Sequence, residues 1–281
     1  MEEKVRRYSI GSLFAGIGGF ELGLERAIPG AYTLWQVEQN NFCKKVLAKH
    51  WPEARIYEDV RNITKNNVEQ VDILCGGFPC QDISVAGKGE GLNGKKSGLW
   101  WEMHRIIDEL QPRAVIMENV AAITIRGLGT VLGSLSEIGY DAEWCTIRAS
   151  DFGAPHKRAR WFCIAYPRTI GYYLNNERRL SSYSISENNC ERDVPSERVE
   201  KKRNNRLGFI DRSSPILQHN EGRGYWEQFP TTSPICRRDD GIPYRVDRIR
   251  ALGNAIVPQC SEWIGKQLWE SGILQAGEYN G

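Results

Sequence analysis

The sequence lacks a long hydrophobic run, and it lacks an apolar N-terminus. Hydrophobic residues make up 41% of its 281 positions, and the mean hydropathy is -0.48. No stretch approaches the roughly 20 apolar residues that span a bilayer. Residues 1–7 are mostly charged or polar and so do not match a secretory signal. These absences predict a soluble, cytoplasmic protein.

Charge of one sign is not in excess, because 37 Lys and Arg residues face 35 Asp and Glu residues for a net charge of +2. Any nucleic-acid surface must therefore be local. The eight cysteines are scattered, without the short paired spacings of a zinc site or the density of a disulfide framework. Cys75, Cys145 and Cys163 lie in apolar runs and are interpreted as small buried hydrophobes. This usage favours a reducing compartment and predicts no metal site.

The chain is long enough for one large core plus a smaller lobe. Its first two thirds alternate short apolar runs with amphipathic segments, which predicts an α/β fold with a mostly parallel sheet. Helical spacing marks residues 101–108, which end before Gln111 and Pro112, and residues 128–138. The predicted strands are residues 8–14, 32–38, 54–57, 71–75, 114–118, 140–149 and 160–165.

The composition changes after residue 167. Residues 168–240 are rich in Ser, Asn, Arg and Glu without a clear period, which is typical of a loop-rich small domain or of a solvated, partly disordered insertion. Apolar order returns from residue 241, and a terminal helix is expected. We therefore divide the chain into a main domain at 1–167, a small domain at 168–240 and a return to the main domain at 241–281.

One cysteine stands on a turn just beyond a predicted strand. Residues 76–84 (GGFPCQDIS) follow the apolar run 71–75 and place Cys80 at the sheet edge where ligands collect in open α/β folds. Pro79 rigidifies that turn. A thiolate there is a candidate nucleophile. The alternative, a buried turn cysteine, is disfavoured by the neighbouring proline and glycines.

A glycine-rich turn, residues 14–19 (FAGIGG), lies between the first strand and the first helix. Alone, it fits a tight turn as well as a nucleotide site. Position 21 is Glu rather than Gly, which favours a mononucleoside such as S-adenosylmethionine over a dinucleotide. Glu38 ends the second strand about 20 residues on, where an acidic residue commonly binds ribose. Asp59 follows the third strand and is either an acceptor for an adenine amino group or a helix cap.

Together, residues 14–19, residues 76–84 and the tripeptide 118–120 (ENV) resemble the C5-cytosine DNA methyltransferase family. The string 250–258 (RALGNAIVP) completes the match, although by itself it predicts a loop with a Gly-Asn turn leading into a helix. The resemblance covers residues 8–166 and 241–270. It implies a Rossmann-like S-adenosylmethionine-dependent methyltransferase domain with a small, loop-rich target-recognition domain at 168–240.

The resemblance implies a set of catalytic roles. Cys80 adds to C6 of a cytosine flipped out of the duplex, and Glu118 holds or shares a proton at N3, for which burial must raise its pKa. A glutamate at a strand end also caps a following helix. Arg158 and Arg160 point to one face if they lie on a strand, and in the family they support the carboxylate and the base. Here His156 replaces the usual glutamine of Gln-x-Arg-x-Arg. The alternative interpretation of Arg158 and Arg160 is a plain basic strand edge.

For the cofactor, S-adenosylmethionine, and its product S-adenosylhomocysteine, the resemblance also assigns positions. Phe14 stacks on adenine, Glu38 binds the ribose and Asp59 binds the adenine edge, with Val60 beside it. The remaining members of this predicted site lie near the methionine portion: Gly16, Gly18, Gly19 and Asn254.

DNA contacts are expected in two segments. Residues 84–98 carry five glycines, which is typical of a mobile loop that contacts phosphates, and the family resemblance makes this the loop that closes over the flipped base. Lys96 stands where the family commonly has arginine, so a monodentate phosphate contact is expected. In 168–240 the aromatic residues 225, 226 and 229 are interpreted as a small core, although base stacking is the alternative. The predicted DNA-binding residues are Ser84, Lys88, Lys95, Lys96, Arg223 and Arg237.

The sequence therefore predicts a sequence-specific DNA (cytosine-5-)-methyltransferase of a restriction-modification, orphan or phage system. The expected partners are double-stranded DNA and a cognate restriction endonuclease. Family precedent favours a monomer, and a DNA substrate predicts association with the nucleoid. The alternatives are an RNA cytosine-5 methyltransferase, a catalytically inactive nucleic-acid-binding relative, and a Rossmann-type oxidoreductase.

Overall fold

The computed structural model describes residues 6–79, 98–172, 174 and 245–276. Their centre is a seven-stranded sheet of order β3-β2-β1-β4-β5-β7-β6. The strands from β3 to β5 are parallel, and β7 runs antiparallel to both of its neighbours. The strands are β1 (Tyr8–Leu13), β2 (Ala31–Val37), β3 (Arg55–Tyr57), β4 (Ile73–Gly76), β5 (Ala114–Val120), β6 (Tyr140–Arg148) and β7 (Ala159–Pro167).

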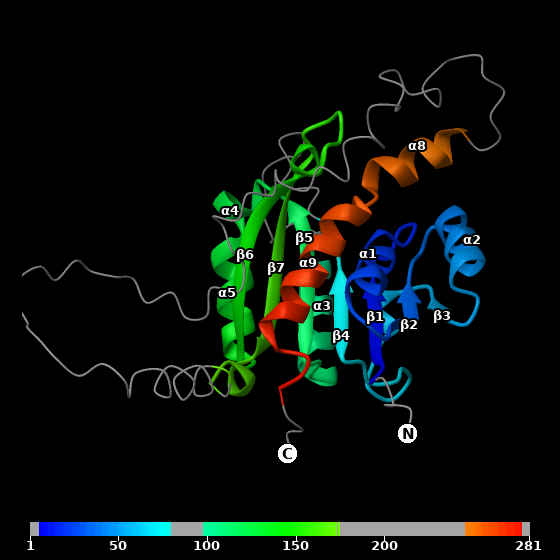
Figure 1. The fold of residues 1–281 in the computed structure, drawn as a ribbon. Coiled ribbons are helices and arrows are strands. Elements are labelled where there is room, and N and C mark those ends of the chain that lie inside the picture. Colours follow the sequence, from blue (N-terminus) through cyan, green and yellow to red (C-terminus); the bar gives the residue numbers. More distant parts are fainter. Residues whose placement is uncertain (1–5, 80–97, 173, 175–244, 277–281) are drawn as a thin grey trace, which may run out of the picture.

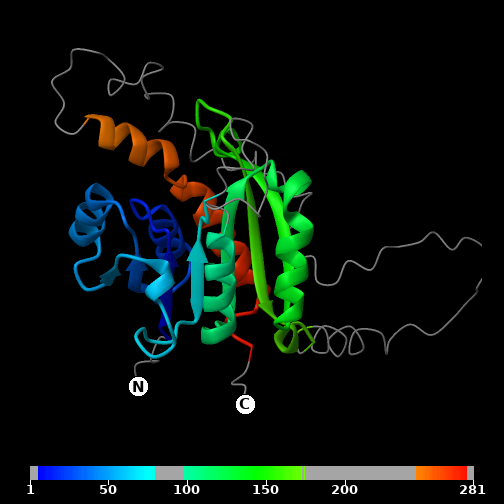
Figure 2. The ribbon, with the colours of Figure 1, turned by 180° about the vertical axis from the view of Figure 1, so that it is seen from behind.

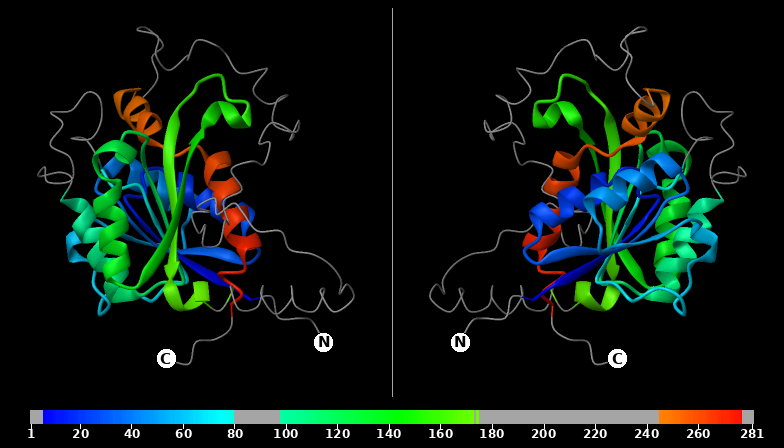
Figure 3. Two further views of the ribbon diagram at one scale, coloured as in Figure 1. Left: turned by 90° about the vertical axis from the view of Figure 1, so that its left-hand side faces the viewer. Right: turned by 90° about the vertical axis from the view of Figure 1, so that its right-hand side faces the viewer.

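Helices cover both faces of the sheet, as the views from the front, the back and the edge show (Figures 1, 2 and 3). Successive residues of one strand enter opposite cores: Val115 belongs to the cluster beneath α3 and α5, whereas Ile116 belongs to the cluster beneath α1 and α9. This is why the central strands are continuously apolar. The helices are α1 (Gly19–Ala27), α2 (Asn41–His50), α3 (Leu99–Leu110), α4 (Ile123–Arg126), α5 (Leu128–Glu137), α8 (Arg245–Asn254) and α9 (Pro258–Ser271), with short 3₁₀ turns η1 (Val60–Asn62) and η3 (Ala149–Phe152).

The chain reverses direction across the sheet between β1 and β4. From β1 the chain moves outward to β2 and β3, and it then returns to place β4 on the other side of β1. Ligands of open α/β sheets bind outside the carboxyl ends of the strands at such a point. The carboxyl ends of these strands form the upper edge of the sheet in Figure 1.

The C-terminal helix packs against the first helix. The side-chain hydroxyl of Ser261 donates to the carbonyl of Gly19 at 2.7 Å. A β-carbon at Gly23 would lie 2.1 Å from Ser261 Oγ, and one at Gly265 would lie 2.7 Å from Ala27 Cβ. The two helices therefore approach closely because both present glycine, and α9 brings the chain back beside the glycine-rich turn.

The predicted α/β fold with its mostly parallel sheet is confirmed, and each predicted strand has a counterpart within a few residues. One local prediction was wrong. Residues up to Asn254 are helical as the end of α8, so Gly253 and Asn254 do not form a turn, although residues 255–257 do lead into a helix, α9, as expected. Glycine and asparagine are common both in turns and at the ends of helices. A Gly-Asn dipeptide in the sequence therefore does not distinguish a turn from a helix end.

Three further expectations concern the division into domains, a membrane span and a metal site. Most of 168–240 lies outside the described residues, so the division into domains stays a prediction. Among the residues that the structure does describe, no helix combines the length and apolar character needed to cross a membrane. Within the same residues, no cluster of His, Cys, Asp and Glu side chains is arranged to hold a metal ion.

The predicted burial of cysteines holds for two of the three. Cys75 and Cys163 are fully buried, and burial holds the pKa of each thiol well above its usual value. Cys145 is half-buried at the edge of the α1 and α9 core. All three are free of disulfides, as expected of cysteines that serve as packing residues.

Candidate functional site at the carboxyl edge of the sheet

The glycine-rich turn after β1 is built from left-handed backbone conformations. Phe14, Gly16 and Gly18 have φ angles of 56°, 60° and 89°. Such a conformation is rare for phenylalanine and easy for glycine. A β-carbon at Gly18 would lie 2.2 Å from the ring of Trp51, whereas the space beside Gly16 is open. Gly18 is therefore required by packing, and Gly16 leaves the backbone accessible to a ligand.

Glu38 ties this turn to the start of α2. Its carboxylate accepts the backbone N–H of Gly16 at 2.8 Å through Oε2 and that of Asn40 at 2.7 Å through Oε1. Asn40 in turn caps α2, because its side-chain oxygen accepts from Phe42 and Cys43 at 2.9 and 3.0 Å. The structure thus brings Glu38 to the glycine-rich turn, as the predicted ribose site requires. Each carboxylate oxygen keeps acceptor capacity beyond one hydrogen bond.

Asp59 and Val60 follow β3 at the same edge. Asp59 is the N-cap of η1: its Oδ1 accepts from the backbone N–H of Arg61 at 3.0 Å, and its Oδ2 lies 3.7 Å from the Arg61 guanidinium. The capping alternative is therefore observed, and the half-buried carboxylate retains acceptor capacity. Val60 is buried, and as the first residue of η1 its N–H has no acceptor within the turn.

Glu118 lies within β5 rather than at its end, since the strand continues to Val120. Its Oε1 forms an ion pair with Nε of Arg160 at 3.0 Å. Burial raises the pKa of Glu118 to about 7, against the opposing positive charges of Arg160 and Arg158. A carboxyl group with this pKa exchanges a proton near neutral pH, which general acid and base chemistry requires.

The antiparallel strand explains how the arginine reaches the glutamate. In the β5–β7 register Glu118 faces Phe162, and Val120 faces Arg160. The first residues of β7 therefore lie beside the last residues of β5, and both are at the carboxyl edge of the parallel strands. The predicted convergence of Arg160 and Glu118 is thus observed.

Arg158 also lies near Glu118, but it does not lie on a strand as expected. It precedes β7 and has a φ angle of 34°, so the two arginines are not alternating strand residues. Its guanidinium donates to the carbonyls of Gly253 at 2.9 Å and Ala255 at 2.6 Å. Arg158 therefore fastens the end of α8 to the site. Asn254, which stands between these two carbonyls in the chain, is exposed at the last position of α8.

Two residues to which the sequence analysis gave no individual role lie in or against the segment leading to Cys80. The side-chain amide of Asn119, which is buried, donates to the carbonyl of Phe78 at 3.0 Å. The ring of Phe78 packs on Trp100 with centroids 5.0 Å apart. The signal for Asn119 was its polar side chain within an otherwise apolar strand, next to Glu118.

Gly77 is the second residue to which the sequence analysis gave no individual role. A β-carbon on Gly77 would lie 2.9 Å from Glu118 Oε2 and 3.9 Å from Ile256 Cδ1. The glutamate therefore rests against bare backbone, and Ile256 of the C-terminal return borders the same spot. Gly19 is in a similar position, because a β-carbon there would lie 2.5 Å from the carbonyl oxygen of Ile256. The segment after α8 thus joins the glycine-rich turn to the Glu118 site.

Several predicted residues lie outside the described part of the chain. They are the candidate nucleophile Cys80 and the candidate DNA contacts Ser84, Lys88, Lys95, Lys96, Arg223 and Arg237. Cys80 comes directly after Pro79, which is described. His156, at the position of the family's glutamine, is exposed just before Arg158.

Two curated proteins with similar sequences are type II methyltransferases. The chain is 39% identical over 156 residues to the type II methyltransferase M.CviJI of Paramecium bursaria Chlorella virus IL3A, a match that covers 54% of this chain and 41% of that protein. It is 32% identical over 171 residues to the type II methyltransferase M.NgoBI of Neisseria gonorrhoeae, covering 59% and 53%. The chain thus spans about half the length of these curated relatives.

A solved structure shares the fold. The methyltransferase EhMeth of Entamoeba histolytica superposes with a TM-score of 0.51 at 19% identity, covering 57% of this chain and 53% of that one. A model of C-5 cytosine-specific DNA methylases matches residues 8–234, which is most of the chain. The chain therefore belongs to the C-5 cytosine-specific DNA methylase family.

Proposed function

We propose that the chain is a DNA (cytosine-5-)-methyltransferase that transfers a methyl group from S-adenosylmethionine to C5 of a cytosine flipped out of double-stranded DNA. The observation that carries this proposal is the Glu118–Arg160 ion pair, whose side chains are 13% and 26% exposed, next to the segment that leads to Cys80. Its carboxyl group, with a pKa of about 7, is suited to hold a proton against a bound base at neutral pH.

The residues after β1, β2 and β3 fit the cofactor. The open backbone at Gly16 admits a close approach, and the carboxylate of Glu38 beside it would accept ribose hydroxyls. Asp59 would accept from the adenine amino group, and the Val60 N–H would donate to the adjacent ring nitrogen. Phe14 would hold the adenine, while Gly18, Gly19 and Asn254 would serve the methionine end. The bound cofactor supplies an electrophilic methyl group on sulfur and leaves as S-adenosylhomocysteine.

The chain's own residues make the base reactive. The thiolate of Cys80 forms a bond to C6 of cytosine, and Glu118 shares its proton with N3, where electron density accumulates. Arg160 holds the carboxyl group in place through the ion pair, and the positive charge of Arg158 acts on it from nearby. After C5 has gained the methyl group it loses its proton to a base, either water or a side chain, and the C6–sulfur bond breaks to release Cys80.

The DNA contacts and partners belong to the same proposal. Ser84, Lys88, Lys95 and Lys96 contact phosphates, and Arg223 and Arg237 contact the target site. Because relatives of this chain are named type II methyltransferases, we infer a cognate restriction endonuclease as partner. A monomer that works on the nucleoid in the cytoplasm fits this role.

Base-resolution sequencing of 5-methylcytosine tests the proposal. DNA from cells that express the wild-type chain is compared with DNA from cells that express Cys80→Ala. We expect methylation within one short motif in the wild type and none in the variant, because the thiolate is required for attack at C6. Equal methylation in both would overturn the mechanism. No methylation in either, from a protein that binds S-adenosylmethionine, would overturn the DNA substrate.

A further inference from the structure

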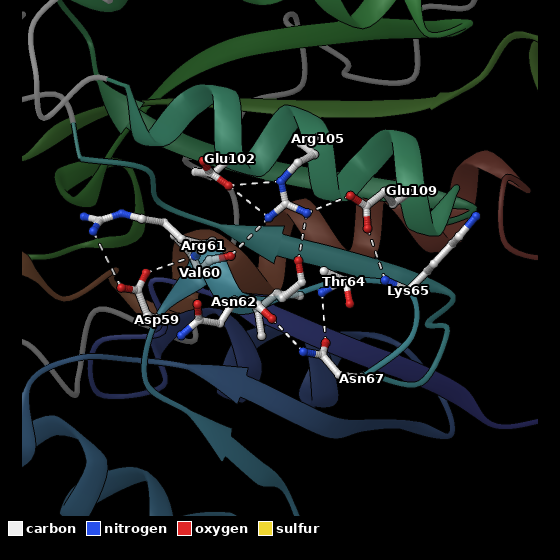
Figure 4. A network of polar contacts seen from close by, with 11 residues as sticks. Asp59, Val60, Arg61, Asn62, Thr64, Lys65, Asn67, Glu102, Arg105 and Glu109 are labelled. Carbon is white, nitrogen blue, oxygen red and sulfur yellow. Dashed lines mark hydrogen bonds and ion pairs between the residues drawn. The ribbon is translucent and has the colours of Figure 1, made fainter.

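All five N–H groups of the Arg105 guanidinium have acceptors (Figure 4). Two bonds go to Glu102 Oε2, from Nε at 3.0 Å and from Nη2 at 2.9 Å. One bond joins Nη1 to Glu109 Oε1 at 2.7 Å. The other two reach backbone carbonyls on a distant part of the chain. A fully used guanidinium is held in one orientation, unlike that of a solvent-exposed arginine.

The two backbone acceptors belong to the turn that contains Asp59 and Val60. Nη1 donates to the carbonyl of Ile63 at 2.8 Å, and Nη2 is 3.4 Å from the carbonyl of Val60. Arg105 thus holds both ends of η1 from the neighbouring helix α3. Figure 4 shows the guanidinium between α3 and this turn.

Glu109 strengthens the same connection. Its second oxygen, Oε2, accepts the backbone N–H of Lys65 at 3.2 Å. The hydrogen bond from Arg105, which is the largest effect, lowers the pKa of Glu109. The carboxylate therefore stays charged and bridges α3 to Lys65, two residues after the turn.

A purely helical role does not account for this arrangement. Ion pairs at i,i+3 and i,i+4 on a helix surface contribute little to stability, and Arg105 makes one of each with Glu102 and Glu109. Its contacts to Ile63 and Val60 span 42 and 45 residues of sequence. Helix pairing alone requires neither of these contacts.

We propose that Arg105 is a positioning residue for the adenine edge of the cofactor. By fixing the turn 59–63 against α3, it places the Asp59 carboxylate and the Val60 N–H so that together they recognise the amino group and the neighbouring ring nitrogen. This inference rests on the cofactor site of the proposed function. Arg105 itself does not contact the ligand.

Isothermal titration calorimetry with two ligands provides the test. S-adenosylhomocysteine is compared with S-inosylhomocysteine, in which oxygen replaces the adenine amino group, for wild type, Arg105→Met and Arg105→Lys. We expect Arg105→Met to lose about ten-fold of the preference for the adenine ligand, because the paired groups no longer hold their positions. Arg105→Lys should recover only part of it, since an ammonium cannot make the forked contacts of the guanidinium.

Arg168→Met is the matched control. Arg168 also joins a carboxylate and a backbone carbonyl, those of Asp141 and Ser136, each at 3.3 Å, but it does so away from the site. Its loss should leave the preference unchanged. Hydrogen exchange without ligand gives an independent measurement: the amides of Arg61, Asn62 and Ile63 should exchange several-fold faster in Arg105→Met than in Arg168→Met.

The outcomes separate the inference from the proposed function. If Arg105→Met weakens both ligands equally, or neither, Arg105 does not position the adenine edge and the inference fails while the cofactor site stands. If the wild type binds neither ligand, the cofactor site fails and the inference fails with it. If Arg105→Met does not fold, Glu109→Gln, which weakens the clamp and keeps the guanidinium, gives the same readout.

Discussion

Nε of Arg160 and Oε1 of Glu118 form an ion pair at 3.0 Å, across two antiparallel strands that the chain joins only after a long excursion through α4, α5 and β6. Burial and this arginine act on Glu118 in opposite directions: burial favours the neutral acid and Arg160 favours the carboxylate. Burial has the larger effect, and the pKa settles at about 7. The pair is thus set to gain or lose a proton at the pH of the cell.

Glu118→Gln should change how stability depends on pH. The pKa of Glu118 is about 7 in the folded protein and 4.5 as its ordinary value. A raised carboxyl pKa contributes stability that is fully present below the unfolded pKa and is lost as pH rises through the folded one. The free energy of unfolding of the wild type relative to Glu118→Gln should therefore fall by about 3 kcal/mol as pH rises from the unfolded pKa of 4.5 to the folded pKa of about 7.

Urea denaturation at a series of pH values measures this difference. Glu137→Gln removes one negative charge at an exposed position near the end of α5 and is the control for net charge. A flat difference between wild type and Glu118→Gln across the window would show that burial does not raise the pKa of Glu118. Methyl transfer by Glu118→Gln should also fall by about 10²- to 10⁴-fold, as expected for loss of a general acid.

Gly77→Ala should impair catalysis through Glu118. The added methyl group would lie 2.9 Å from Oε2, so the carboxylate must move away from the base. A displacement of this size at a reacting group costs about 100-fold in turnover. Gly129→Ala is the matched control, because that glycine is exposed in α5 with nothing within 4 Å of its added carbon. Single-turnover methylation at saturating cofactor is the measurement, and equal rates for the two variants would contradict the prediction.

The sequence predicted the strands of the sheet well because their apolar runs, although short, are separated by clear breaks. It did not predict that β7 lies antiparallel between β5 and β6, since strand order is set by packing of residues far apart in the chain. The contact of Arg160 with Glu118 was therefore available only from family resemblance. The period-two argument placed Arg158 on a strand, but the backbone turns at this residue with a φ angle of 34°.

The positions of single side chains were harder to foresee. Nothing in the residue Phe14 indicates its left-handed backbone, which follows from closing the turn between β1 and α1. The helical end of α8 is fastened by Arg158, 95 residues away from Gly253, and no local pattern contains that interaction. The glycine-rich turn and Glu38, by contrast, were predicted together because the family motif specifies both.

Asn119→Ala should lower turnover more than its effect on stability implies. It leaves the carbonyl of Phe78 without its buried partner, which costs about 1–3 kcal/mol, and it frees the segment that leads to Cys80. We expect about ten-fold slower methyl transfer with an unchanged affinity for S-adenosylmethionine. Ser134→Ala, which removes a buried side-chain hydrogen bond to Val131 within α5, is the control and should leave turnover unchanged. A normal rate for Asn119→Ala would exclude a positioning role.

Glu38→Ala should weaken S-adenosylmethionine binding by about 10- to 100-fold while leaving duplex affinity nearly unchanged. The loss has two sources, because the carboxylate both accepts ribose hydroxyls in the proposed site and holds the Gly16 and Asn40 amides in place. Glu38→Gln separates them: an amide oxygen keeps one backbone contact and loses the charge, so its affinity should fall between wild type and Glu38→Ala. Glu69→Ala, which removes an exposed ion pair with Arg55, is the control. Calorimetry that finds duplex affinity reduced more than cofactor affinity would remove Glu38 from the cofactor site.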